Sequence, residues 1–400
     1  MHAHADGHDQ ALSRTPVINP CYCARIILRG LVMLSRLARL FLLVVLGANA
    51  LNAQAETWPG EQWSSRPAPR SAALDALETY AFPTRDEANR TGVRTDALLV
   101  IRDGEIVYER YVGVTNAETP HLTWSVSKSI LATVLGVAFG DGRFQLADPV
   151  AKFYKPFSAH PDITVQDLMH WASGLDWQED YEYAPLNSSV VAMLYTRGRN
   201  DMARFTASHK AATSPGTRYL YSSGDSTVLA AALKGMVGAE AYPSYPWTAL
   251  FEPIGIRSAV WETDASGTFV GSSYAYMTAR DLARVGLLMQ RGGQWQDKPL
   301  LNKAWMDFVL TPFKGEQIQA KVEVPGGQWW LNRTADGGSG PWPDAPADTF
   351  AALGHWGQAL YVIPSQKLVI VRYADDRDSS YDHDQMLKRI QAAFGKENGQ

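Results

Sequence analysis

The alternation of apolar and polar residues predicts β-strands near both ends of the chain. Residues 97–112 form two alternating segments around Asp103-Gly104, a dipeptide that favours a tight hairpin turn. Beyond Gly326, the segments GQWWLN, ALYVIP and KLVIVRY are short and apolar, and the last two flank Pro364-Ser365-Gln366. We therefore expect one hairpin early in the chain and another near its end.

Helix-like patterns occupy most of the interval between these strands. Residues 124–139 are almost entirely apolar and are followed by Gly140-Asp141-Gly142, which predicts a buried helix with a glycine-rich end. Ser71, Thr164 and Thr278 stand where N-caps are expected for three other helices. The other expected helices span residues 71–80, 163–171, 200–208, 227–236, 278–290 and 383–394.

Strands at both ends with helices between them predict an α+β fold. We expect the N- and C-terminal strands to join in one antiparallel sheet with flanking helices, and residues 141–249 to form a mostly helical inserted region. The chain has 46% hydrophobic and 20% charged residues, which is typical of a globular protein. Its net charge of -4 favours neither nucleic acid nor an acidic membrane surface as a partner.

The N-terminal extension, residues 1–55, is expected to direct export. Two arginines precede an apolar run over residues 40–46, and small residues follow up to Ala55, a pattern typical of a cleaved signal peptide. The apolar run is too short to span a bilayer comfortably, although an uncleaved membrane anchor is the alternative. The polar stretch before Met33 fits no signal peptide. We therefore expect translation to start at Met33 and cleavage to follow Ala55.

Export and cysteine content together limit the chemistry of the mature chain. The only cysteines are Cys21 and Cys23, both upstream of the expected cleavage site. The mature protein is therefore expected to contain no thiol, no disulfide and no cysteine-ligated metal. We expect it to be periplasmic or secreted, without stable insertion in a membrane after cleavage.

The segment Trp124-Ser125-Val126-Ser127-Lys128 carries the most distinctive candidate chemistry. Ser125 and Lys128 are three residues apart on a predicted helix, so their side chains share one face. The apolar surroundings predict that Lys128 is buried, and burial lowers the pKa of a lysine. Such a lysine can take the proton of Ser125 and make it nucleophilic. The alternative, an exposed lysine on an amphipathic helix, is disfavoured by the apolar neighbours.

Several segments in a fixed order resemble the serine β-lactamase and penicillin-binding-protein superfamily. They are WSVSKS, FQLADPVAKFYKP, ITVQDLMHWASGL, PGTRYLYSSGDSTVLA, FEPIGIRSAVWETD, YMTARDLARVGLLM and ALGHWGQALYVIP. The resemblance extends over residues 96–373 and is strongest to class C β-lactamase-like esterases and amide hydrolases, including 6-aminohexanoate-dimer hydrolases. It implies a β-lactamase/transpeptidase-like fold and a single catalytic domain over residues 56–400.

The second motif of this superfamily is Tyr-x-Asn or Tyr-x-Ser just before a helix. Tyr221-Ser222-Ser223 matches it within PGTRYLYS, whereas Tyr242-Pro243-Ser244 matches only the bare pattern in a proline-rich loop. The resemblance implies that the Tyr221 phenol exchanges a proton with Lys128 and that Ser223 belongs to the pocket. A core tyrosine with a structural hydrogen bond is the alternative for Tyr221.

The third motif is Lys-Thr-Gly, His-Thr-Gly or a looser variant on a strand beside the nucleophile. His355-Trp356-Gly357 fits this motif at the start of the ALYVIP strand. The resemblance implies that the amide N–H of Gln358 joins that of Ser125 in an oxyanion hole. It also implies that Gly357 lets the backbone approach substrate and that His355 lines the pocket, with packing alone as the alternative for His355. Trp356 replaces a small residue, which argues against recognition of a β-lactam carboxylate.

The resemblance as a whole implies a serine hydrolase that cleaves a small ester or amide through an acyl-enzyme, with no cofactor and no metal. β-Lactam hydrolysis and D-Ala-D-Ala carboxypeptidase action are the alternatives within this class. A catalytically silent cell-wall peptide-binding protein is the alternative of another class. The chain contains no Gly-x-Ser-x-Gly, His-Glu-x-x-His or phosphate-loop motif. Tyr181 and Tyr183 either edge the cleft or belong to an acidic surface loop.

Overall fold

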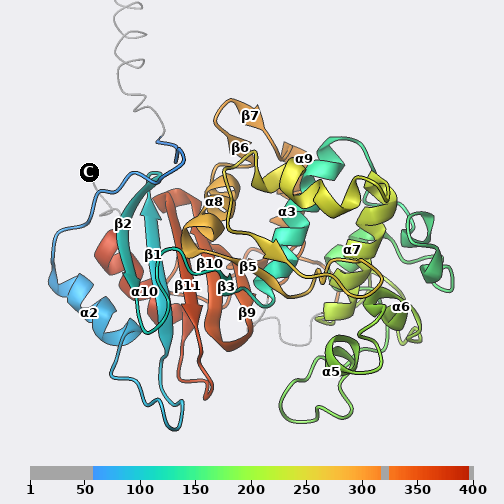
Figure 1. Cartoon of the computed structure of the whole chain (residues 1–400), viewed down its shortest axis with the longest axis horizontal. Helices are drawn as coiled ribbons and strands as arrows, with labels where there is room; N and C mark the ends of the chain where they lie inside the picture. The colour runs from blue at the N-terminus through green and yellow to red at the C-terminus, as the bar shows by residue number, and fades with distance from the viewer. Residues whose placement is uncertain (1–56, 317–323, 396–400) are drawn as a thin grey trace, which may run out of the picture. The chain divides into compact units, whose positions relative to one another are not determined.

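An antiparallel sheet of six strands lies at one side of the protein, and helices form the other side (Figure 1). The computed structural model describes residues 57–316 and 324–395. The strands follow in the order β2-β1-β11-β10-β9-β8. Their bounds are β1 Thr95–Arg102, β2 Glu105–Tyr111, β8 Trp330–Leu331, β9 Phe350–Gly354, β10 Gln358–Ile363 and β11 Leu368–Ala374. The α+β class expected from the sequence is confirmed.

The sheet joins the two ends of the described chain. β1 pairs antiparallel with β11, so that Ala97 lies opposite Tyr373. The early hairpin turns at Asp103 and Gly104, whose φ angles of +55° and +85° are those of a tight two-residue turn. Residues Thr57–Gln400 form one compact unit. The expected signal peptide, the Met33 start and both cysteines lie outside the described residues.

Helices cover both faces of the sheet. On one face, α2 (Ala72–Ala81) and α10 (His383–Phe394) pack side by side and share an apolar cluster with the sheet that includes Leu77 and Ile390. On the other face, α8 (Ala279–Gln290) lies across β10, β11 and β1, and α3 (Val126–Gly140) reaches β9 and β10. The main core therefore lies between the sheet and the helical region.

The helical region surrounds α3 and α7 (Figure 1). Its helices are α4 Val165–Met169, α5 Ser189–Tyr195, α6 Met202–Ala207, α7 Ser223–Val237 and α9 Lys303–Val309, with a π-helical turn Trp247–Phe251. Two small sheets accompany them, formed by β3 His121–Leu122, β5 Ala275–Met277 and β4 Val260–Trp261, and by β6 Gln294–Trp295 and β7 Lys298–Pro299.

Most of the expected helices are present, with differences at their starts. Ser71, Thr164 and Thr278 all accept a backbone N–H as N-caps, as expected. The helix expected over residues 227–236 begins earlier, at Ser223, because the preceding serine caps it. The expected strand GQWWLN is reduced to the two residues of β8.

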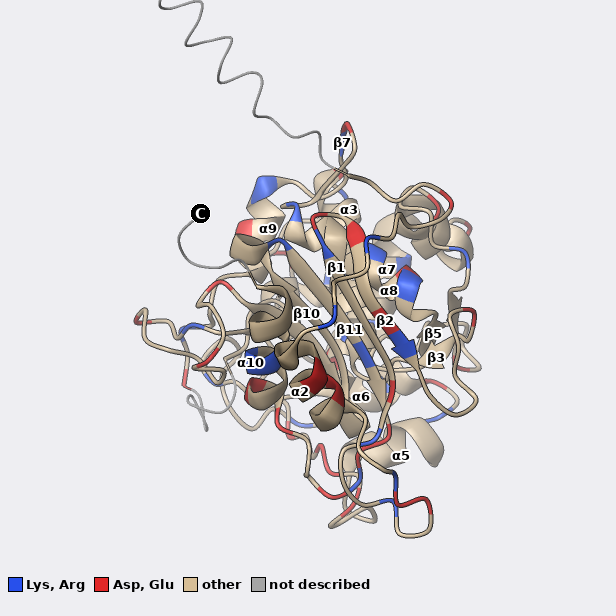
Figure 2. Ribbon diagram, turned by 90° about the vertical axis from the view of Figure 1, so that its left-hand side faces the viewer, with Lys and Arg blue, Asp and Glu red and all other residues tan. Residues whose placement is uncertain are grey.

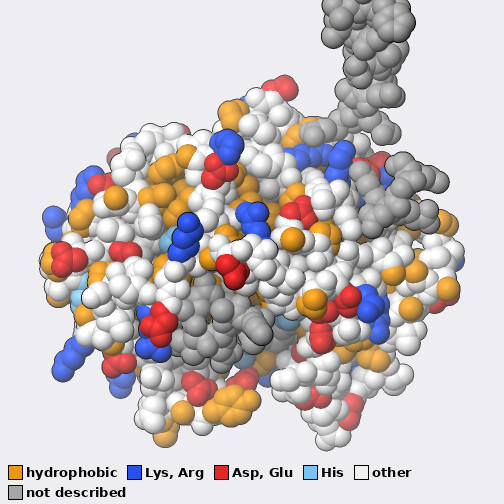
Figure 3. Space-filling view, turned by 180° about the vertical axis from the view of Figure 1, so that it is seen from behind, with side chains coloured by type: hydrophobic (Ala, Val, Ile, Leu, Met, Phe, Trp, Pro, Cys, Tyr) orange, Lys and Arg blue, Asp and Glu red, His pale blue; other side chains and the backbone are white. Residues whose placement is uncertain are grey.

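Lysine and arginine alternate with aspartate and glutamate along the ribbon of the described chain (Figure 2). The face seen from behind shows the same mixture, with apolar side chains between the charges (Figure 3). The face drawn in Figure 3 therefore shows charges of both signs side by side. Within the described part of the chain, no helix combines the length and the apolarity needed to cross a membrane.

Candidate active site

A strained turn places Ser125 directly before α3. Trp124 has a φ angle of +48°, in the left-handed region that bulky residues rarely occupy. Its ring is held in that turn by contacts with four other rings, those of Tyr181, Tyr274, His355 and Trp356. Ser125 occupies the N-cap position of α3, but its side chain makes no capping hydrogen bond. The hydroxyl is therefore available to the side chain of Lys128.

Lys128 lies on the first turn of α3 and is only 1% exposed. Its Nζ lies 2.9 Å from Oγ of Ser125, 3.0 Å from Oγ of Ser223 and 3.0 Å from the carbonyl oxygen of Ser272. Burial lowers the pKa of Lys128 from 10.5 to about 8, whereas the charge of Glu179 acts in the opposite direction. The neutral amine is therefore the main form of this lysine above about pH 8, well below the range of an ordinary lysine.

The three contacts of Nζ determine where a neutral amine directs its lone pair. The carbonyl oxygen of Ser272 can only accept, so it takes one hydrogen of Nζ. The hydroxyl of Ser223 donates its own proton to Glu179, so it accepts the second hydrogen of Nζ. The lone pair of a neutral Lys128 is then left facing the hydroxyl of Ser125. This arrangement can withdraw a proton from Ser125 without any rotation of the lysine.

Glu179 supports the lysine from a loop before α5. Its carboxylate accepts the hydroxyl and the backbone N–H of Ser223, the latter at 2.9 Å, and the indole N–H of Trp177 at 2.6 Å. Three donors satisfy a carboxylate well and fix its orientation. Glu179 thus fixes the direction of the Ser223 hydroxyl and places a negative charge near Lys128.

Tyr221 stands at the pocket wall, immediately before the N-cap of α7. Its ring packs against those of Trp171 and Trp330, with centroid distances of 4.9 Å and 5.5 Å. Nζ of Lys128 lies 4.9 Å from the centroid of the Tyr221 ring. The structure thus brings together the three residues that the sequence proposed for catalysis.

These residues border a pocket of about 410 Å³. Its wall is mostly aromatic and aliphatic, and Glu179 is the one acidic residue among the lining residues, which include no lysine or arginine. The lining residues are Ser125, Glu179, Tyr181, Tyr221, Val324, Trp330, Pro341, Trp342, Leu353, Gly354, His355 and His383. Within the described residues, no group of three or more His, Cys, Asp or Glu side chains could hold a metal ion.

The third motif lies in a different place from the one expected. The ALG and ALYVIP segments are two strands, β9 and β10, joined by a tight turn in which Trp356 and Gly357 have φ angles of +57° and +85°. β9 is the strand beside the nucleophile, because a Cβ on Gly354 would lie 2.6 Å from the carbonyl oxygen of Thr123. His355 follows directly and lines the pocket.

Gly357 and Gln358 are therefore not pocket residues, and their expected roles are corrected. A Cβ on Gly357 would lie 2.1 Å from Oδ2 of Asp376, so the glycine is needed beside a buried ion pair and not beside substrate. Gln358 begins β10 and is buried, and its side chain bonds both backbone groups of Ala374 in β11. Ser223 is also not a wall residue, since it lies behind the pocket against Lys128.

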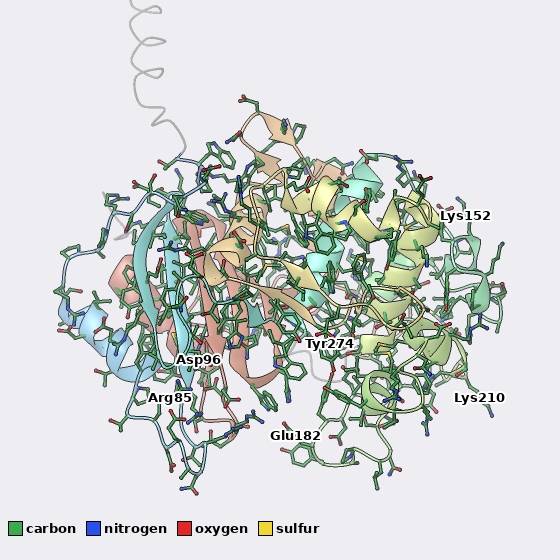
Figure 4. The ribbon with its side chains drawn as sticks, viewed as in Figure 1. Arg85, Asp96, Lys152, Glu182, Lys210 and Tyr274 are labelled. Carbon is green, nitrogen blue, oxygen red and sulfur yellow. The ribbon has the colours of Figure 1, made fainter. Side chains whose placement is uncertain are left out.

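The mouth of the pocket is formed by a loop that contacts the β9–β10 turn. Glu182 lies at the edge of the molecule between the sheet and the helical region (Figure 4). Its carboxylate is 3.2 Å from Nε2 of His355 and also 3.2 Å from the indole nitrogen of Trp356. Tyr181 stacks on His355 and lines the pocket, whereas Tyr183 is 92% exposed. Tyr181 therefore belongs to the cleft, and Tyr183 belongs to the surface.

Comparison with known proteins places this site in a family. The sequence profile of the β-lactamase family matches residues 81–393. The chain belongs to the β-lactamase family. It is 28% identical over 336 residues to the 6-aminohexanoate-dimer hydrolase of Paenarthrobacter ureafaciens, covering 79% of this chain and 81% of that protein.

Solved structures with a similar fold include two hydrolases. A candidate 6-aminohexanoate-dimer hydrolase from Bacillus anthracis matches with a TM-score of 0.61 and 20% identity over 85% of this chain and 88% of its own. EstCE1, a hydrolase with promiscuous acyltransferase activity, matches with a TM-score of 0.64 and 16% identity over 81% of this chain and 100% of its own. The superfamily expected from the sequence is confirmed, and the protein is a hydrolase of this family.

Several pocket residues could not be predicted from the sequence. Glu179 lies close in sequence to Tyr181 and Tyr183, which are candidates for the cleft from the sequence. No local sequence pattern, however, indicates that Glu179 contacts Ser223. Trp330, Trp342 and His383 come from separate elements that only the folded sheet brings to one wall. Their large aromatic rings were indistinguishable from core residues in the sequence.

Proposed function

We propose that this β-lactamase-family protein hydrolyses a small ester or amide through an acyl-enzyme, with Ser125 as nucleophile and Lys128 as base. The proposal is carried by the 2.9 Å contact between Nζ of Lys128 and Oγ of Ser125, at a lysine whose other two polar contacts use its hydrogens. A base within hydrogen-bond reach of the hydroxyl, with a pKa near neutrality, is what activation of a serine requires.

In the acylation step, Nζ of Lys128 takes the hydroxyl proton while Oγ of Ser125 bonds to the carbonyl carbon. The π electrons of the carbonyl move to its oxygen, which gives a tetrahedral oxyanion. When this intermediate collapses, the bond to the leaving group breaks, and the leaving group receives the proton through Lys128 and Tyr221. An alcohol or amine departs, and the acyl group stays on Ser125.

Deacylation follows the same route with water as the nucleophile. Tyr221 and Lys128 together take a proton from the water while its oxygen attacks the acyl carbon. Collapse of the second tetrahedral intermediate breaks the bond to Oγ, returns the proton to Ser125 and releases a carboxylic acid. The position of Tyr221 at the pocket wall beside the ammonium of Lys128 supports this role.

The backbone N–H groups of Ser125 and His355 are best placed to donate hydrogen bonds to the oxyanion. His355 replaces Gln358 in this proposal, because the end of β9 and not the start of β10 borders the pocket beside Ser125. Two backbone donors that are already fixed by secondary structure need no reorganisation when the oxyanion forms. The N-terminal end of α3 adds a favourable partial charge at the same position.

The pocket wall favours a neutral substrate. Lysine and arginine are missing from the described residues that line it, so a carboxylate on the substrate would lack a cationic partner. β-Lactams and D-Ala-D-Ala peptides both carry such a carboxylate. We therefore rank uncharged esters and amides above the β-lactamase and carboxypeptidase alternatives.

Labelling with a fluorophosphonate probe tests the nucleophile. We expect the wild-type protein to form a stable adduct and the Ser125→Ala variant to form none, because Oγ is the only atom removed. Labelling that survives in Ser125→Ala would refute the assignment. An unlabelled wild-type protein would favour the silent peptide-binding alternative, and turnover of a chromogenic cephalosporin would favour the β-lactamase alternative.

The pH dependence of kcat/KM is expected to report Lys128. Lys128 acts as a base only when neutral, so activity should rise with pH and level off above about pH 8, the value to which burial lowers its pKa. Replacing Glu179 with Gln removes a negative charge that favours the ammonium form. The pKa of Lys128 should then fall further, and the acid limb of the profile should move to lower pH.

The matched control for this profile is Glu182→Gln. Glu182 is also an acidic residue of the mouth loop, but it contacts His355 and Trp356 instead of the Ser223–Lys128 pair. Its substitution should leave the acid limb in place. An acid limb that stays unchanged in Glu179→Gln, or moves equally in both variants, would contradict the assignment of the limb to Lys128.

We also propose that the protein is exported and acts in the periplasm or outside the cell. The proposal rests on the signal-peptide pattern that ends at Ala55. N-terminal sequencing of the mature protein should begin at Glu56. A mature chain that still carries Cys21 would refute both the cleavage site and the start at Met33.

A further inference from the structure

His383 lines the same pocket as Ser125 but has no role in the acyl-transfer steps. It is the first residue of α10, and its ring lies near those of Trp342, Tyr361 and Tyr381, at centroid distances of 6.5, 5.9 and 4.9 Å. The pocket residues Val324, Trp330, Pro341, Trp342 and Leu353 are apolar or aromatic. A polar group beside such apolar residues is well suited to fix the orientation of a ligand.

A chain of two phenols favours the neutral form of His383 that carries its hydrogen on Nε2. The hydroxyl of Tyr361 lies 2.5 Å from Nδ1 of His383 and 2.7 Å from the hydroxyl of Tyr381. If Tyr381 donates to Tyr361 and Tyr361 donates to Nδ1, every phenol proton has an acceptor. In the reverse direction the half-buried hydroxyl of Tyr381 would have to donate to water, since Tyr361 is its only hydrogen-bond partner among the described residues, so the first direction is favoured.

Charge and burial keep the three groups neutral. Burial raises the pKa of the Tyr361 and Tyr381 phenols. Burial, and then the charge of Arg372, lower the pKa of His383 to about 4. Arg372 is itself paired with Asp376, and its guanidinium lies 3.7 Å from the centroid of the Tyr381 ring. A neutral imidazole that accepts at Nδ1 has its hydrogen on Nε2.

We propose that His383 is a specificity-determining residue whose Nε2–H donates a hydrogen bond to a carbonyl oxygen of the substrate, distinct from the carbonyl that Ser125 attacks. The phenol of Tyr361 occupies Nδ1, so Nε2 is the ring nitrogen available to the pocket. A neutral carbonyl suits this donor better than a carboxylate, because no cation lines the described wall. The substrate class is thus an ester or amide with a second carbonyl group.

This inference rests on the proposed function, and the experiment separates the two. A dialkyl ester is compared with analogues in which one methylene, in the acyl chain or in the alcohol, is replaced by a carbonyl. Hydrolysis of the parent ester that disappears in Ser125→Ala supports the proposed function alone. Without such hydrolysis, both the proposed function and the role of His383 are refuted.

The keto analogues then test His383 itself. The wild-type protein should prefer at least one keto analogue over the parent ester by about tenfold in kcat/KM, the contribution of one well-placed hydrogen bond. In His383→Phe this preference should vanish, so that the keto analogues and the parent ester are hydrolysed with similar kcat/KM values. A preference that is absent from the wild type, or that persists in His383→Phe, would overturn the proposal.

A second measurement reads the tautomer of His383 directly in the wild-type protein. Long-range ¹H–¹⁵N NMR spectra of protein labelled at histidine distinguish the two neutral tautomers, and Tyr361→Phe assigns the His383 signals because it removes the partner of Nδ1. We expect the Nε2–H tautomer in the wild-type protein. The Nδ1–H tautomer would refute the role of His383 as a donor, whatever the substrate preference.

Discussion

Replacing Lys128 with Met should lower kcat by about 10²–10⁴-fold, the usual range for loss of a general base. Methionine has a similar length and suits the apolar surroundings of α3, so the fold should be retained. The loss then reports the amine alone, because Ser125, Tyr221 and the pocket wall are unchanged. Steady-state kinetics on an activated ester, with circular dichroism as a check of folding, measure this effect.

The control for this experiment is Lys152→Met. Lys152 carries the same charge, but it lies at the surface in an ion pair with Asp148. Its substitution should change kcat by less than a factor of two, as expected for a surface position far from the chemistry. Near-normal turnover in Lys128→Met would contradict the proposed mechanism, in which Lys128 is the base that takes the proton of Ser125.

Replacing Asp376 with Ala should destabilise the protein by about 3–5 kcal/mol, the typical result of breaking a buried ion pair on one side. Arg372 is 0% exposed and Asp376 is 7% exposed. Asp376 accepts from both terminal nitrogens of Arg372, at 2.5 and 3.1 Å, and from the backbone N–H of Arg94 at 2.7 Å. Its loss leaves the guanidinium buried without a counter-charge. Equilibrium unfolding in urea measures the difference.

An exposed ion pair provides the comparison. Lys303 and Asp307 are paired on the surface of α9, and the substitution Asp307→Ala should cost less than about 1 kcal/mol because solvent screens both charges. If the two substitutions lowered the free energy of unfolding by equally small amounts, the Arg372–Asp376 pair would be accessible to water in solution. The structural role assigned to Gly357, packing against that ion pair, would then be refuted as well.

The elements that the sequence predicted well are those with a local cause. The caps of α2, α4 and α8 depend on one side chain and a backbone N–H three residues later, and all three are present. The pairing of Ser125 with Lys128 depends on helical spacing within one turn, and it too is present. Local geometry of this kind can be read from residue types alone.

The third motif shows where such reading fails. In the segment from Phe350 to Ile363, Trp356 and Gly357 reverse the chain between two strands. A bulky Trp at positive φ is an unusual turn residue, so the sequence indicated neither this turn nor β9, and a strand was expected only over the ALYVIP segment. Gln358 was expected as the oxyanion donor from the family resemblance, whereas the turn brings His355 to the pocket. Glu179 was missed for a related reason, because its partner Ser223 is distant in sequence and no local pattern links them.

The pairing of β1 with β11 has a consequence for how the protein is made. Ala97 in β1 pairs with Tyr373 in β11. The hydrogen bonds between these two central strands therefore cannot form until almost the whole chain has left the ribosome. Contacts between such distant segments form slowly, because a long loop must be ordered first. During synthesis the sheet would thus remain incomplete. A chain without its central sheet is closer to the unfolded state that a translocation channel for unfolded polypeptides accepts.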